Sequence, residues 1–311
     1  MTRAVVFAYH NVGVRCLSVL LAHGIEVALV LTHRDDPEEN LWVDSVAELA
    51  ALHDIATITP ADPNEPGIVA QISKLSPDFL FSFYYRQMIK RPLLESARRG
   101  AYNMHGSLLP KYRGRAPVNW AVLAGERETG ATLHRMLDAP DAGAILAQQA
   151  VPILPDDSAF EVFNKVTVAA EIALDRVLPQ LVAGTAIETP QDLALGSYFG
   201  GRRPEDGRID WRLSAQQIHN LVRAVAPPYP GAFSALAGGT LRVGKSLVES
   251  RRPPRPGGPG LYAEGSNVYA DCGDGRVLRL VALEFGGARL DAAGFTARFG
   301  SEKLLLPRSS S

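Results

Sequence analysis

The stretch AVVFAYHNVGVRCLSVLLAHGIEVALVL, residues 4–31, combines two kinds of hydrophobic pattern. Residues 4–8 and 26–31 are apolar without alternation, which predicts strands buried on both faces of a sheet. Residues 14–23 between them carry apolar side chains at helical spacing, and Gly24 follows where a helix end favours a left-handed residue. Strand, helix and strand in this order predict one unit of a parallel α/β sheet.

The same pattern repeats further along the chain. Helix-like segments at 44–52 and 66–75 alternate with strand-like segments at 56–59 and 79–83. Two strand-like runs, 131–137 and 144–151, precede a long amphipathic helix over 159–181, for which Asp157 and Ser158 are the expected caps. We therefore predict an α/β domain with a mainly parallel sheet, whose ligands bind beyond the carboxyl ends of its strands.

Beyond about Thr189 the composition changes. Gly, Pro and Arg accumulate, an amphipathic helix is predicted at 214–225, and short strand-like runs separated by Gly-rich turns follow from Ala232. This pattern predicts a small all-β domain. The expected division is a catalytic domain over 1–188, a linker over 189–212, a β domain over 213–305 and a tail over 306–311.

Composition and motifs argue against several classes of protein. The formal net charge of −1 gives no basic excess that would favour nucleic acid as a partner. Cys16 and Cys272 lack metal-site spacing, so we expect reduced thiols and no metal. No apolar segment approaches the ~20 residues that cross a bilayer, and no signal-peptide core is present, which predicts a cytoplasmic protein without membrane insertion. The first strand lacks a following G-x-G-x-x-G, which argues against a nicotinamide dehydrogenase.

The segment NMHGSLLPKYRGRAPVNW, residues 103–120, carries the candidate chemistry. Asn103 and His105 share one face of a strand that ends before GSLLP, at the edge where such sheets bind ligands. An amide donor beside an imidazole suits a reaction that passes through an oxyanion. These residues alone support equally well the alternative that Asn103 caps the backbone and His105 has a structural role. Asp141, in DAPDAG, lies in a turn, where Asp usually caps the local backbone, although its carboxylate is also able to orient an imidazole.

HGSLLPKYRGRAP resembles the SLLP-x-x-RG-x-x-P signature of the 10-formyltetrahydrofolate-dependent formyltransferases. The resemblance extends to FSFYYRQMI, TGATLHRM and VRAVAPPYPGAFS, and so covers most of the chain. It implies a Rossmann-like N-terminal domain followed by a small, OB-like C-terminal β-barrel. Within the family, the segment is more similar to the formyltransferase domain of the bifunctional enzymes that modify UDP-4-amino-4-deoxy-L-arabinose, a lipid A precursor, than to methionyl-tRNA formyltransferase.

The resemblance also implies roles for individual residues. Asn103 and a protonated His105 would stabilise the oxyanion. His105 would then donate a proton to the departing folate nitrogen, while Asp141 holds the imidazole and raises its pKa. The proton of the attacking amine would go to His105, Asp141 or water. Gly106 and Gly114 are expected to permit tight turns or close approach. The positions that match the family's folate site are Gln87, Met88, Ile89, Arg115, Leu137, Asp138, Ala139 and Pro140.

The segment THRDDPEENLW, residues 32–42, bears on the acceptor. Methionyl-tRNA formyltransferases carry a basic insertion here, whereas residues 34–40 have one cation and four carboxylates, a net charge of −3. An acidic loop repels phosphates, so a UDP-amino sugar, UDP-4-amino-4-deoxy-L-arabinose, is the predicted acceptor and 10-formyltetrahydrofolate the co-substrate. The alternatives are methionyl-tRNA, another UDP- or dTDP-linked amino-deoxyhexose, and a non-catalytic folate or nucleotide-sugar binding protein. The oligomeric state is left open.

Overall fold

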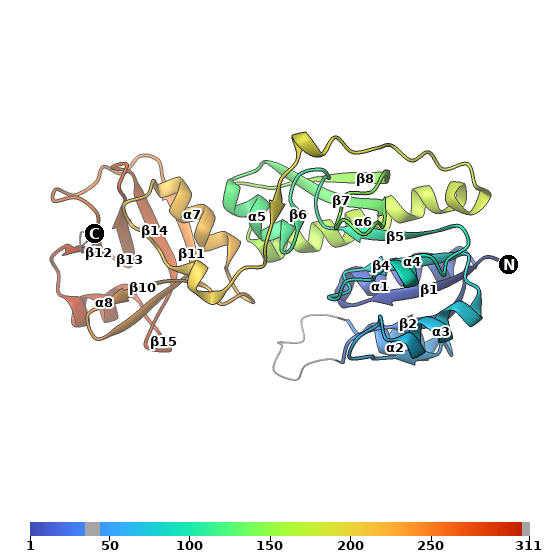
Figure 1. The fold of residues 1–311 in the computed structure, drawn as a ribbon. Coiled ribbons are helices and arrows are strands. Elements are labelled where there is room, and N and C mark those ends of the chain that lie inside the picture. The colour runs from blue at the N-terminus through green and yellow to red at the C-terminus, as the bar shows by residue number, and fades with distance from the viewer. Residues whose placement is uncertain (35–43, 307–311) are drawn as a thin grey trace. The chain divides into compact units, whose positions relative to one another are not determined.

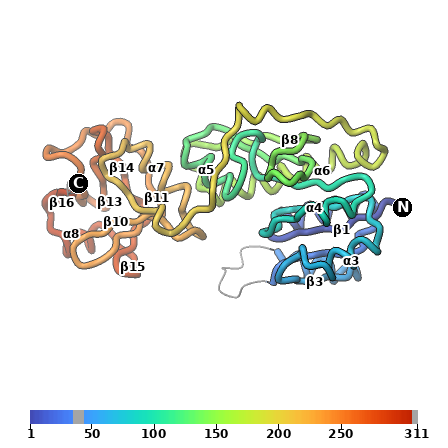
Figure 2. Tube along the Cα trace, in the orientation of Figure 1, coloured from blue at the N-terminus to red at the C-terminus, as the bar shows by residue number. Residues whose placement is uncertain are grey.

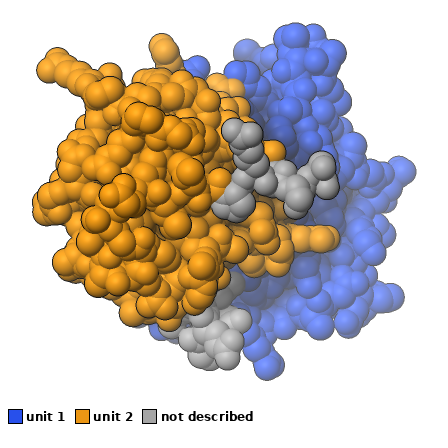
Figure 3. Space-filling model, turned by 90° about the vertical axis from the view of Figure 1, so that its left-hand side faces the viewer, with its two compact units in different colours: residues 1–117, 128–152, 163–200 blue, residues 118–127, 153–162, 201–311 orange. Residues whose placement is uncertain are grey.

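The computed structural model describes residues 1–34 and 44–306, so most of the predicted acidic loop lies outside the described residues. The chain divides into two compact units, which Figure 3 distinguishes by colour. Unit 1 comprises Met1–Pro117, Glu128–Pro152 and Phe163–Gly200, and unit 2 comprises Val118–Arg127, Ile153–Val162 and Gly201–Ser311. The first part of the segment predicted as a linker, residues 189–200, therefore belongs to unit 1.

Unit 1 is built on a seven-stranded sheet with the order β3-β2-β1-β4-β5-β7-β8 (Figure 1). The first five strands in this order are parallel, and β7 and β8 are antiparallel to their neighbours, which confirms the predicted α/β fold with a mainly parallel sheet. The strands are β1 (Arg3–Ala8), β2 (Glu26–Leu31), β3 (Thr57–Ile58), β4 (Phe79–Phe83), β5 (Gly100–His105), β7 (Glu128–Arg135) and β8 (Ile145–Pro152).

Helices cover both faces of this sheet because the central strands are apolar on both sides. Alternate residues such as Val5 and Phe7 join a core cluster with α3 and α4, whereas α1 packs on β1 and β4 and is joined to α6 by the Arg15–Glu171 ion pair. The helices are α1 (His10–Ala22), α2 (Val46–Leu52), α3 (Pro66–Leu75), α4 (Arg91–Leu94) and α6 (Ala159–Ala183).

Two local predictions are corrected by the structure. The strand expected at 131–137 is β7, Glu128–Arg135, so Leu137 lies in the loop that follows it. Ser158 caps α6, since its Oγ accepts from Glu161 N and the Glu161 carboxylate accepts from Ser158 N. Asp157 instead accepts a hydrogen bond from Leu154 N, in the preceding turn.

Unit 2 contains the predicted C-terminal β domain. Its sheet has the order β10-β11-β14-β13-β12-β16, with β15 beside β14, and within the described residues no pairing joins β10 to β16. The sheet is therefore an open half-barrel, with α7 packed on β11 (Figure 2) and α8 on β12. The elements are α5 (Pro117–Ala124), α7 (Ala215–Ala224), β10 (Ala232–Leu236), β11 (Gly239–Glu249), β12 (Gly260–Glu264), β13 (Asn267–Asp271), β14 (Val277–Phe285), β15 (Ala288–Arg289), α8 (Ala292–Phe299) and β16 (Leu304–Leu305).

Candidate active site

The candidate site lies where one face of β5 changes from apolar to polar. Ala101, Asn103 and His105 alternate along the strand and so share a face. Ala101 belongs to the core cluster under α3 and α4, and Asn103 and His105 follow it toward the carboxyl end. The register places Met104 beside Phe83 of β4, so the pair lies at the edge where the parallel strands end together.

His105 is held between two oxygen acceptors. Its Nε2 lies 2.8 Å from Tyr112 O, and its Nδ1 lies 3.5 Å from Asp141 Oδ1. Burial lowers the pKa of His105 below the ordinary value, and this outweighs Asp141 and the Tyr112 carbonyl, which act to raise it. Asp141 thus acts to raise the pKa of the imidazole, as predicted. Burial has the larger effect, however, and it disfavours the protonated imidazole that the sequence predicted.

Asp141 enters the site from the loop between β7 and β8, with its backbone at φ 53. Besides His105, its Oδ1 faces His134 Nε2 at 3.4 Å, and its Oδ2 accepts from Gly114 N at 2.9 Å. Burial by itself would raise the pKa of this carboxyl, but the two imidazoles and the Gly114 N–H together lower it to about 2. The carboxylate is therefore ionised at neutral pH.

His134 is a site residue that the sequence reasoning missed. It is buried on β7 directly opposite Asn103, and its Nε2 lies 3.2 Å from Asn103 Nδ2. His134 Nδ1 lies 2.9 Å from Arg135 O and donates to it, and in the tautomer that carries no hydrogen on Nε2, this nitrogen accepts one hydrogen of the Asn103 amide. Within the described residues, the other amide hydrogen has no hydrogen-bond partner and is available to a ligand. TGATLHRM contains this residue, but only the antiparallel register brings it to Asn103.

Hydrogen bonds also fix the loop after β5. Thr132 Oγ1 donates to Ser107 O at 2.6 Å, and Gln148 Nε2 donates to Leu109 O at 2.9 Å. A Cβ on Gly106 would lie 2.0 Å from the Tyr84 hydroxyl oxygen, which confirms the predicted close approach.

The next part of the loop contains β6 (Arg113–Gly114), which pairs with β9 (Tyr198–Phe199). A Cβ on Gly114, at φ 98, would lie 2.1 Å from Phe199 O, so this position also requires a glycine. Arg115 follows with an exposed side chain, and its backbone N donates to Phe199 O at 3.0 Å.

The two loops predicted to bind folate lie near each other. Ile89 is buried in the same core cluster against which Met136 packs, so its side chain is committed to packing. Gln87 uses its amide to donate to Ala61 O, whereas Met88 is exposed at the tip of the first loop. The pKa of Arg91, just after the first loop, is raised mainly by its hydrogen bond and charge pairing with Glu95, and to a smaller extent by the charge of Asp138 in the second loop. The second loop also exposes Leu137, Asp138, Ala139 and Pro140.

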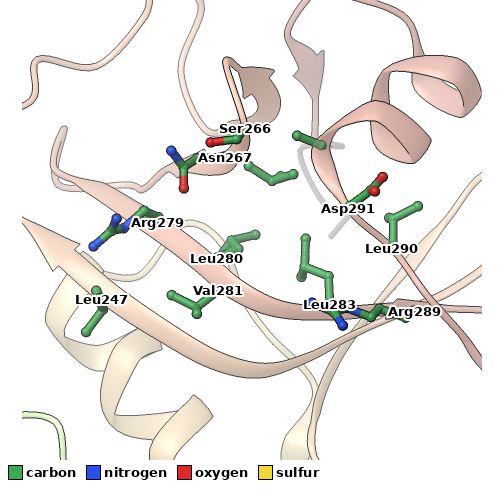
Figure 4. Close-up of a pocket in the computed structure, with 12 residues that line it drawn as sticks. Leu247, Ser266, Asn267, Arg279, Leu280, Val281, Leu283, Arg289, Leu290 and Asp291 are labelled. Atoms are coloured by element: carbon green, nitrogen blue, oxygen red, sulfur yellow. The ribbon is translucent and has the colours of Figure 1, made fainter.

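A pocket of about 250 Å³ lies elsewhere, in unit 2 (Figure 4). Its lining side chains include Leu280, Leu283 and Asp291, and it contains none of the predicted catalytic residues. Within residues 1–34 and 44–306, no group of three or more His, Cys, Asp or Glu is arranged to hold a metal ion. Over the same residues, no helix is long and apolar enough to span a bilayer.

Comparison with protein families identifies the class of this fold and site. Residues 8–178 match the formyl transferase family, and residues 202–300 match the C-terminal domain of formyl transferases. The first match alone spans more than half of the chain. The chain belongs to the formyl transferase family.

Solved structures share the fold at low sequence identity. An N-formyltransferase from Helicobacter canadensis, in complex with folinic acid and dTDP-3-aminofucose, is 20% identical with a TM-score of 0.72, over 90% of this chain and 99% of that one. A sugar N-formyltransferase from Shewanella is 18% identical with a TM-score of 0.61, over 80% and 99%. HypX from Aquifex aeolicus, in complex with tetrahydrofolic acid, is 18% identical with a TM-score of 0.63, over 96% and 47%.

Proposed function

We propose that this protein transfers the formyl group of 10-formyltetrahydrofolate to the amine of a nucleotide-linked amino sugar. The observation that carries this proposal is the meeting of Asn103, His105 and Asp141 at one sheet edge, in a chain of the formyl transferase family. An oriented amide donor, a buried imidazole and an ionised carboxylate supply what acyl transfer through a tetrahedral oxyanion requires.

In the proposed reaction the amine lone pair forms a bond to the formyl carbon, and the carbonyl electron pair moves to oxygen. Asn103 donates its remaining Nδ2 hydrogen to this oxyanion. When the carbon–nitrogen bond to folate breaks, its electron pair stays on the folate nitrogen. The amine loses one proton and the folate nitrogen gains one, so the transfer consumes no external acid or base.

His105 is the group proposed to carry that proton. Its Nε2 hydrogen is engaged by Tyr112 O, which leaves Nδ1 as the nitrogen with a lone pair. The lowered pKa keeps His105 neutral and ready to accept the amine proton. The imidazolium so formed lies beside ionised Asp141, which stabilises it until the proton passes to the folate nitrogen. His105 thus serves first as base and then as acid.

The co-substrate is assigned to the two neighbouring loops after β4 and β7. Met88 and Leu137 are large apolar side chains that are 51% and 47% exposed. These exposed apolar side chains are suited to contact a flat pterin ring. The exposed guanidinium of Arg115, which follows Asn103 and His105 in the same segment of sequence, offers a planar hydrogen-bond donor. Structures of relatives in complex with folinic acid or tetrahydrofolic acid support a folate in this family.

For the acceptor, an amino-deoxyhexose linked to a nucleoside diphosphate is favoured. The Helicobacter canadensis relative in complex with dTDP-3-aminofucose supports this class. The narrower choice of UDP-4-amino-4-deoxy-L-arabinose, and with it a role in lipid A modification, stays a prediction from sequence resemblance.

A direct test offers the purified protein 10-formyltetrahydrofolate with four acceptors in parallel: a dTDP-3-amino-deoxyhexose, a dTDP-4-amino-deoxyhexose, UDP-4-amino-4-deoxy-L-arabinose and methionyl-tRNA. Mass spectrometry follows the gain of a formyl group, and absorbance follows release of tetrahydrofolate. We expect formylation of an amino sugar. Formylation of the tRNA alone would overturn the acceptor class, and folate binding without release of tetrahydrofolate would indicate a non-catalytic binding protein.

A further inference from the structure

Residues 188–200, here termed the strap, run from the end of α6 back along unit 1 (Figure 2). Near its start, Thr189 exchanges two main-chain hydrogen bonds with Ile145, both 2.8 Å long, and is thereby fixed to the first residue of β8. Near its end, β9 pairs with β6 in the loop that carries Arg115. Between these anchors the strap passes the loop of Asp141.

Gln191 is the strap residue that holds this loop. Its Nε2 donates to Asp141 O at 3.0 Å and to Gly143 O at 2.6 Å, so both amide hydrogens are used on the carbonyls that flank the turn. Its Oε1 is buried and makes no hydrogen bond within the part of the chain that the structure describes. The bonding of this side chain is therefore directed at the loop of Asp141 alone.

The conformation of Asp141 explains why its loop needs an external restraint. Its φ of 53 lies in the left-handed region, which Asp adopts more readily than most residues with a Cβ but less readily than glycine. With the backbone in this conformation, the carboxylate stands 3.5 Å from His105 Nδ1 and accepts from Gly114 N. Relaxation of the turn would move the carboxylate away from the imidazole.

The far end of the strap restrains the other side of His105. Ser197 Oγ accepts from Tyr112 N at 2.9 Å, and Phe199 stacks on the Tyr112 ring with centroids 5.5 Å apart. The carbonyl of the same Tyr112 accepts from His105 Nε2. One segment of chain thus holds both partners of the imidazole.

We propose that the strap is part of the active site, and that Gln191 is a positioning residue that holds Asp141 against His105. The proposal rests on the formyl transfer proposed above, in which the Asp141–His105 pair moves the proton. It predicts that loss of the Gln191 amide has the same effect as loss of the Asp141 charge, because both changes remove the carboxylate from the imidazole.

The test compares Gln191→Met, which keeps the length of the side chain and removes its donors, with Gln180→Met, an exposed glutamine at the end of α6. We expect Gln191→Met to lower kcat about 10- to 100-fold, the order of loss that a misplacement of about 1 Å causes, with the KM for the formyl donor changed less than about threefold. In an Asp141→Asn background it should cost almost nothing further, because both changes act through one group. Gln180→Met should leave kcat unchanged.

A second readout does not depend on turnover. In protein with isotope-labelled histidine, the NMR titration of His105 should show a lower pKa in Gln191→Met than in the wild type. The positioning role of Gln191 would be overturned if Gln191→Met left kcat or the titration of His105 unchanged. It would also be overturned if Gln191→Met lowered kcat by the same factor in the Asp141→Asn background as in the wild type. Failure of both Gln191→Met and the isosteric Gln191→Glu to fold would overturn it as well. If the wild type formylates no acceptor, the proposed function fails, while the titration still decides the role of Gln191.

Discussion

Asp141→Asn removes the carboxylate charge beside His105 and keeps the shape of the side chain. Asp141 Oδ1 lies 3.5 Å from His105 Nδ1, and both side chains are largely buried. Unit charges at this separation interact by about 5 kcal/mol at an effective dielectric constant of about 20. A nearby opposite charge commonly shifts a pKa by about 1–3 units, which corresponds to about 1.4–4 kcal/mol. We expect the pKa of His105 to fall, because the charge that raises it is removed, and kcat to fall about 10- to 1000-fold.

The assay combines NMR titration of His105 with kcat measured across pH. In the proposed mechanism His105 accepts the amine proton, so it must be neutral at the start, and activity is lost as pH falls through its pKa. Because the substitution lowers that pKa, the acidic limb due to His105 should move to lower pH while the maximum rate decreases. Glu128→Gln, which changes an exposed carboxylate at the start of β7, outside both folate loops, is the control and should change neither quantity. A pKa of His105 that stayed constant or rose in Asp141→Asn would refute the reasoning.

Three further substitutions follow from the geometry. Gly114→Ala should lower kcat about 100-fold, because its Cβ would lie 2.1 Å from Phe199 O; wild-type kinetics would contradict the close approach. His134→Leu should lower kcat about 100-fold, because the Asn103 amide loses the acceptor that orients it. His134→Gln keeps an acceptor and should retain more activity. Equal losses of kcat in the two variants would exclude a role of His134 in orienting Asn103. Ser214→Ala removes the capping box of α7 and should lower the free energy of unfolding by about 1 kcal/mol without changing kcat, as denaturant titration would reveal.

The sequence was sufficient to predict elements that depend on local patterns. The uninterrupted apolar runs at residues 4–8, 26–31 and 79–83 are strands because each is buried on both faces. The helix at 66–75 and the start of α7 were predictable from Pro66 and from the Ser214 cap. The spacing of Asn103 and His105 placed both side chains on one face of β5.

Features that depend on long-range contacts were beyond the sequence reasoning. His134 meets Asn103 only through the antiparallel register of β5 and β7, which no local pattern specifies. Gln191 holds a loop 50 residues earlier in the chain, and its Gly- and Pro-rich surroundings predicted a linker. The pKa of His105 is lowered because the folded chain buries the side chain. The sequence indicated only Asp141, whose charge acts to raise that pKa.

The strap also determines where this protein tolerates recombination. A chimera joined after residue 188 would replace Gln191, Ser197 and Phe199, and with them the hydrogen bonds to the loops of Asp141 and Arg115. A junction after Gly200 keeps these contacts within one parent. Exchange of C-terminal domains between relatives, undertaken to change acceptor preference, should therefore retain residues 188–200 with the N-terminal parent. Otherwise a loss of turnover caused by the junction would be mistaken for a change in specificity.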